Sequence, residues 1–203
     1  MIRSELDAID HVLRGALNTA LLNLQLLSTT VASDAQAGPL IARVRAELRR
    51  LAEGLLPAAL DIVALEIKRT ERVDLRQLVE STLAQQALDQ LVLAPGPSPS
   101  VSGDPDLLAL ALAHLARNSV AATPEDGPAP RIHIDVRPGL AALCVSNACR
   151  DGIPPISGGS IAGRRGHLGG LVVVTRVARL HGGTFGYEAV EGELVARLAI
   201  PIG

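Results

Sequence analysis

The chain has 203 residues and a formal net charge of -2, and 48% of its residues are apolar although it contains no Trp, one Phe and one Tyr. Its acidic and basic residues are interspersed, so nothing in the charge pattern indicates electrostatic binding to nucleic acid or anionic lipid. No apolar run approaches the roughly 18 residues of a membrane span, and the N-terminus has no hydrophobic signal region. Cys144 and Cys149 fit neither a disulfide framework nor a zinc site. We therefore expect a soluble cytoplasmic protein without nucleic-acid or membrane partners.

The first predicted element is an amphipathic helix over Leu6–Leu27. Its apolar residues recur at steps of three and four, which places positions 6, 9, 13, 16, 20, 24 and 27 on one stripe. A different face carries the polar residues Asp7, His11, Arg14 and Asn18. On that face Gly15 leaves room beside His11. A histidine so placed is suited to passing a group to another protein, and the alternative is a surface histidine without chemistry.

A second amphipathic helix is predicted from Pro39 to Leu65, after the polar break Ser28–Gly38. Pro57 should kink it, because proline removes a hydrogen bond and blocks the carbonyl four residues back. The two helices form an antiparallel hairpin that cannot bury two long apolar stripes alone. We therefore expect two copies to form a dimeric four-helix bundle. The alternative is that the hairpin packs against the C-terminal part of its own chain.

The pattern changes from about Val73. A short strand that leads into a helix is predicted at 73–88, and a further strand at 89–95. The Pro, Gly and Ser residues of Ala94–Pro105 indicate a loop. Asp104 should cap a strong helix that has Pro105 in its first turn. Strands are predicted at 131–138, 140–147, 183–190 and 193–202, with a glycine-rich region and a helix at 171–180 between them. This order predicts an α+β chain whose C-terminal part is a two-layer α/β sandwich with a mixed sheet.

Four segments, in this order along the chain, carry a resemblance to a known family: DHVLRGALNTALLNLQLL, LAHLARNSVAA, VSNACRDGIPP and GHLGGLVVVTRVARLHGG. The first resembles the phosphoacceptor helix of sensor histidine kinases. The other three resemble the N-box and the two following boxes of their ATP-binding domain, the Bergerat fold shared with gyrase, MutL and the heat-shock chaperones. The resemblance implies a dimerisation and phosphoacceptor hairpin at 1–70 and an ATP-binding domain at 71–203.

The resemblance also implies roles for individual residues. His11 would accept the phosphoryl group, and Asn118 would hold the Mg²⁺ that bridges the phosphates of ATP, since an amide supplies a hard oxygen ligand. The remaining nucleotide-binding residues would be Asn147, Gly152, Gly166, Gly169 and Gly170. Loop glycines let backbone N–H groups approach phosphate, and a helix N-terminus favours anions. The alternatives are loop flexibility for the glycines and a solvated helix position for Asn118, and we interpret His114 and His181 as structural.

The sequence also departs from the family pattern. The family's adenine-binding Asp corresponds to Asn147 if the segments are aligned on Val145, and to Ala148 if they are aligned on Gly152, Ile153 and Pro154. Leu168 replaces the middle glycine of the last box. Three positions after the histidine also differ. Val12 replaces the usual acidic residue, and Ala16 replaces the usual Pro. Gly15 stands where families with phosphatase activity have Thr or Asn.

The leading hypothesis is a histidine kinase core whose sensor is absent or on another chain. It would be a homodimer that binds ATP with Mg²⁺, phosphorylates His11 and passes the group to an aspartate of a response-regulator receiver domain. One alternative is a histidine phosphotransferase whose degenerate C-terminal domain is a docking scaffold for the receiver. Another is a nucleotide-binding regulator that inhibits a partner kinase by forming mixed bundles.

Overall fold

The computed structural model describes residues 2–30, 37–148, 168–190 and 192–202. It divides the chain into two compact units, Met1–Leu65 and Glu66–Gly203. Among the described residues, no helix combines the length and the apolar character that crossing a bilayer requires.

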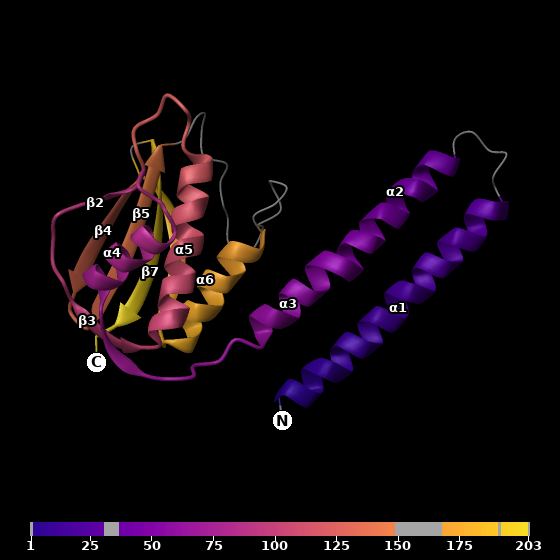
Figure 1. Ribbon diagram of the computed structural model, residues 1–203, viewed down its shortest axis with the longest axis horizontal. Helices are drawn as coiled ribbons and strands as arrows, with labels where there is room; N and C mark the ends of the chain where they lie inside the picture. Colours follow the sequence, from indigo (N-terminus) through magenta and orange to yellow (C-terminus); the bar gives the residue numbers. More distant parts are fainter. Residues whose placement is uncertain (1, 31–36, 149–167, 191, 203) are drawn as a thin grey trace. The chain divides into compact units, whose positions relative to one another are not determined.

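The first unit is a helical hairpin (Figure 1). Its elements are α1 (Ile2–Thr30), α2 (Ala37–Arg50), the π-helical turn η1 (Leu51–Leu55) and α3 (Leu56–Val63). Helix α1 contacts both α2 and α3, which confirms the predicted hairpin. Pro57 lies in the first turn of α3, and directly before it the N–H of Leu56 donates to the carbonyl of Leu51, five residues back. The chain therefore accommodates the missing N–H of Pro57 with a π-helical turn.

The hairpin leaves most of its large apolar side chains uncovered. Among its described side chains only Ile41 and Ala52 are buried. Exposed large apolar residues occur on every helix of the unit: Val12, Leu13, Leu22, Leu26, Leu27, Leu40, Val44, Leu51, Leu55 and Val63. The exposure of so many large apolar side chains is consistent with a surface that associates with another protein.

The second unit is a two-layer sandwich of helices on a sheet (Figure 1). Its helices are α4 (Leu75–Gln85), α5 (Pro105–Ala122) and α6 (Leu168–Leu180). Its strands are β1 (Glu71–Asp74), β2 (Val92–Leu93), β3 (Ser100–Gly103), β4 (Arg131–Arg137), β5 (Leu140–Ala148), β6 (Thr184–Val190) and β7 (Glu193–Pro201). The large sheet has the order β2-β4-β5-β7-β6, with β2 parallel to β4 and the other pairs antiparallel. The predicted mixed sheet is confirmed.

The core of this unit lies between α5 and the sheet. Helix α5 buries apolar residues around most of its circumference, including Leu108, Leu112 and Leu115, and it contacts β5. Leu143 and Val145 of β5 are also fully buried. Because successive strand residues point to opposite faces, the two share one face of the sheet, and residue 147 belongs to the same face.

One predicted loop is wrong. Within Ala94–Pro105, residues Ser100–Gly103 form β3, which pairs antiparallel with β1 and places Val73 opposite Val101. Both valines are buried. Pairing with a distant strand overrides the low strand propensity of serine and glycine here, so a local reading of the sequence could not find this strand.

Candidate functional site

Asn118 lies in the last turns of α5, one turn after His114 on the same face of the helix. The helix begins as predicted, with Asp104 as its cap and Pro105 in its first turn. Both Asn118 and His114 are half-buried. Burial, together with the nearby charge of Arg117, lowers the pKa of His114 below its ordinary value, which favours a neutral imidazole at neutral pH.

Gly170 brings the start of α6 against these two side chains. A Cβ added to Gly170 would lie 3.0 Å from Nδ1 of His114 and 3.5 Å from Nδ2 of Asn118. The first turn of α6, which also contains Gly169, therefore lies beside Asn118, and the absence of a side chain at residue 170 relieves a tight approach to His114. The exposed N–H groups of a helix N-terminus are suited to binding an anion. The structure thus brings together Asn118 and Gly170, which the sequence placed in one site.

Asn147 lies near the end of β5 and is 6% exposed. It occupies the same face of the sheet as Leu143 and Val145, whereas Ala148 belongs to the opposite face. Its Nδ2 donates to the carbonyl of Ala148 at 3.1 Å. Strand β5 and helix α5 end at the same end of the unit (Figure 1). Two further predicted nucleotide-binding residues, Gly152 and Gly166, lie outside the described residues.

His11 is exposed on α1, in the other unit. Its neighbour Asp10 accepts two hydrogen bonds from Nε of Arg14, at 2.7 and 2.8 Å. The neighbour on the other side, Val12, is 68% exposed. A Cβ at Gly15 would meet nothing within 4 Å, so the surface one turn after His11 is open.

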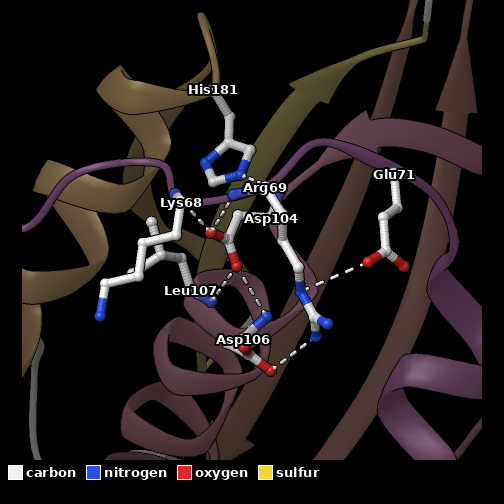
Figure 2. Close-up of polar contacts among 7 residues, drawn as sticks. All are labelled: Lys68, Arg69, Glu71, Asp104, Asp106, Leu107 and His181. Atoms are coloured by element: carbon white, nitrogen blue, oxygen red, sulfur yellow. Dashed lines mark hydrogen bonds and ion pairs between the residues drawn. The ribbon is translucent and has the colours of Figure 1, made fainter.

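His181 has a structural role, in agreement with its interpretation from the sequence. Its Nε2 accepts the backbone N–H of Asp104 at 2.9 Å (Figure 2). Its Nδ1 lies 2.8 Å from the carbonyl of Val177. With Nε2 accepting, Nδ1 carries the proton and donates to Val177. The end of α6 is thereby fastened to the start of α5, which fixes the relative position of the two helices that carry Gly170 and Asn118.

The structure also places His114 beside Asn118 and Gly170, a neighbourhood that reasoning from the sequence did not predict, and this packing is compatible with the interpretation of His114 as structural. The signal was its spacing of four residues from Asn118, which places both side chains on one face of a helix. The contact with Gly170 across two helices was not visible in that spacing.

The donor set fits a magnesium ion only in company with a phosphate ligand. Among the described residues, no group of three or more His, Cys, Asp or Glu side chains could hold a metal ion. Asn118 offers one amide oxygen beside a glycine position with no side chain. Magnesium is commonly held by one or two protein oxygens together with the phosphates of a substrate, so the residues present fit the predicted ion in that form.

Comparison with known proteins gives the chain a family context. No protein-family model matches it. It is 30% identical over 216 residues to the sensor-type histidine kinase PrrB of Mycobacterium leprae (strain TN), a match that covers 94% of this chain and 46% of that protein. The chain thus spans less than half the length of this relative.

Solved structures show the same fold. ShkA, crystallised full-length in complex with AMPPNP, matches 98% of this chain and 45% of its own with a TM-score of 0.61 and 21% identity. A histidine kinase from Burkholderia phymatum STM815 matches 94% of this chain and 96% of its own, with a TM-score of 0.53 and 22% identity. The chain therefore has the fold of a sensor histidine kinase catalytic core, a helical hairpin followed by an α/β domain.

Proposed function

We propose that the chain is a histidine protein kinase of a two-component system, which phosphorylates its own His11 from ATP and passes the group to an aspartate of a response-regulator receiver domain. The observation that carries this proposal is the packing of Gly170, in the first turn of α6, against Asn118 and His114. It joins an oxygen ligand for magnesium to a helix N-terminus suited to phosphate. The similarity to PrrB supports the same reading.

In this proposal the nucleotide binds between α5, β5 and the start of α6. Asn118 holds the magnesium ion, and the backbone at Gly169 and Gly170 faces the phosphates. Gly152 and Gly166, which lie outside the described residues, are the other proposed nucleotide-binding residues. Asn147 accepts a hydrogen bond from the adenine amino group. Its place on the same sheet face as Leu143 and Val145 supports aligning the adenine-binding position on Val145, since Ala148 belongs to the other face.

The chemistry assigned to His11 is a single phosphoryl transfer. A ring nitrogen of its neutral imidazole attacks the γ-phosphorus of ATP, a P–N bond forms as the P–O bond to ADP breaks, and the ring proton passes to solvent. A bound magnesium ion supplies charge neutralisation on the phosphates. The two residues adjacent to His11 in the sequence offer it no free carboxylate, because Val12 is apolar and Asp10 accepts from Arg14.

That last observation favours a second candidate function. A histidine phosphotransferase receives its phosphoryl group from a phosphorylated aspartate and needs no ATP. Its histidine must be exposed, as His11 is, and its C-terminal unit would be a docking scaffold for the receiver domain.

The assembly proposed for either function is a homodimer. The exposed apolar residues of α1, α2 and α3 would be buried if two hairpins formed a four-helix bundle. The proposed partner of this dimer is a receiver domain.

Calorimetric titration with ATP and magnesium tests the proposal. The wild-type chain should bind, and Asn118→Ala should weaken binding about tenfold or more, because a charged ligand loses an oxygen contact worth roughly 1.5 kcal/mol or more. Asn23→Ala, the same change at an exposed position of α1, is the matched control and should bind as the wild type does. Absence of binding by the wild-type chain would contradict the kinase proposal and favour the phosphotransferase.

A further inference from the structure

One buried carboxylate holds two parts of the second unit together. Asp104 is 2% exposed, and its Oδ1 caps α5 by accepting the N–H groups of Asp106 at 3.0 Å and Leu107 at 3.3 Å (Figure 2). Its Oδ2 accepts the N–H groups of Lys68 at 3.0 Å and Arg69 at 3.4 Å. Those two residues lie in Glu66–Thr70, the segment that follows the hairpin and precedes β1. We call this segment the linker.

The surroundings of Asp104 favour both of its roles, capping α5 and binding the linker. Its backbone N–H donates to Nε2 of His181, so the main chain of Asp104 is fastened to the end of α6. Burial alone would raise the pKa of Asp104, but the backbone N–H groups it accepts hold the pKa below its ordinary value. The side chain is therefore ionised at neutral pH, when its hydrogen bonds to the linker are strongest.

The side chain of Arg69 adds exposed ion pairs to this hold. It lies 3.3 Å from Glu71 and 3.1 Å from Asp106 (Figure 2). Exposed pairs of this kind contribute little to stability, so the bonds from Lys68 and Arg69 to the buried Asp104 are the stronger part of the attachment.

We propose that Asp104 is a positioning residue that holds the linker on the second unit and thereby shortens the free chain that joins this unit to the hairpin. At the hairpin end, the N–H of Leu65 donates to the carbonyl of Ile62. With the linker held at Lys68, the chain from Leu65 to Lys68 spans at most about 11 Å, at ~3.6 Å per residue. If the linker is released from Asp104, the free chain extends from Leu65 to Glu71 and spans at most about 22 Å.

The expected effect on His11 phosphorylation rests on the proposed function. His11 lies on the hairpin and Asn118 in the second unit, so phosphorylation within or across a dimer depends on the tether between the units. For a tether that already spans the distance between the two sites, effective concentration falls roughly as the −3/2 power of tether length, so doubling such a tether lowers it about threefold. Asp104 acts on the reaction through the linker and does not touch the reacting atoms.

The experiment compares hydrogen exchange at the backbone N–H groups of Lys68 and Arg69 in the wild type and in Asp104→Ser. Serine caps a helix with its single hydroxyl oxygen and is too short to hold the linker as well. Both amides should exchange about tenfold faster or more in the variant, since their protection comes from bonds to the carboxylate. Labelling of His11 by ATP with magnesium should slow about threefold, while nucleotide affinity stays unchanged.

Two variants keep this test specific. Asp74→Ser removes the carboxylate that caps α4 and accepts from Gln77 and Ser98, and it should leave the linker amides as in the wild type. Lys68→Pro removes one linker N–H without changing Asp104, and it should accelerate exchange at Arg69. This second variant decides the question if Asp104→Ser fails to fold.

The proposal is overturned if the linker amides exchange equally fast in the wild type, in Asp104→Ser and in Lys68→Pro. Faster exchange with unchanged His11 labelling overturns the positioning role. If the wild type takes no label from ATP, the proposed function fails instead. In that case the rate of trypsin cleavage after Arg69 reports whether the linker is released. Cleavage should be faster in Asp104→Ser than in the wild type, and an unchanged rate would overturn the inference.

Discussion

Arg14 holds Asp10 from one turn further along α1, with its Nε 2.7 Å from one carboxylate oxygen and 2.8 Å from the other. The hydrogen bond and the charge of Asp10 raise the pKa of Arg14, so Arg14 keeps its positive charge at neutral pH. The carboxylate nearest to His11 in sequence is therefore already engaged. The residue on the other side, Val12, has no group that could take up a proton.

This arrangement predicts slow autophosphorylation that a new carboxylate should accelerate. Val12→Glu should speed labelling of His11 by ATP, by up to about 10²–10⁴-fold, the usual range for general-base assistance. Val12→Gln, of nearly the same shape and without charge, is the control and should leave the rate near that of the wild type. If the chain is a phosphotransferase, neither variant should take label from ATP.

The exposed apolar stripes of the hairpin predict a dimer. Leu13→Glu should dissociate it, because a charge buried in the bundle costs several kcal/mol. Asn23→Glu introduces the same charge at an exposed polar position of α1 and should remain dimeric. Sedimentation at micromolar concentration measures both, and a wild-type chain that sediments as a monomer would contradict the bundle.

Gly170→Ala should weaken nucleotide binding. The added Cβ would lie 3.0 Å from His114 and 3.5 Å from Asn118, so α6 or the two side chains must shift, and overpacking of this kind costs roughly 1–3 kcal/mol. The control is Gly186→Ala in β6, where an added Cβ meets nothing within 4 Å. Equal affinities of the two variants for ATP with magnesium would remove Gly170 from the site.

The lowered pKa of His114 predicts a dependence of stability on pH. A group whose pKa is lower in the folded state contributes stability above its ordinary value of 6.5, and this contribution is lost as the pH falls through that value toward the folded pKa. Between pH 7.5 and pH 5.5, values that flank roughly the ordinary pKa of histidine, the nucleotide-free wild type should lose more free energy of unfolding than His114→Gln. Denaturant unfolding at the two pH values measures this difference, and equal losses would count against the assignment.

The fold was predictable where local chemistry decides it. Asp104 and Pro105 marked the start of α5, and the alternating strands near the centre of the sheet were recognisable from their period. Strand β3 was missed because its stability comes from pairing with β1 and from the burial of Val101. The π-helical turn before Pro57 depends on how the backbone relaxes around a missing donor, which the sequence shows only as an expected kink.

The candidate site was predictable only in part for a similar reason. Motif spacing indicated Asn118 and Gly170 separately, and the structure adds their proximity and the presence of His114 beside them. The hold of Asp104 on the linker joins residues 36 positions apart. No periodicity or motif predicts such a bond, because it depends on how the start of α5 and the linker meet in space.

In the proposed function all phosphoryl groups pass through His11, and labelling of this residue tests that role. The wild-type chain is incubated with labelled ATP and magnesium, and separately with a phosphorylated receiver domain, beside His11→Gln under the same conditions. Our account predicts label on the wild type from ATP, acid-labile as expected for a P–N bond, and none on His11→Gln from either donor. Label of equal extent on His11→Gln would contradict the account and leave His11 as a surface histidine.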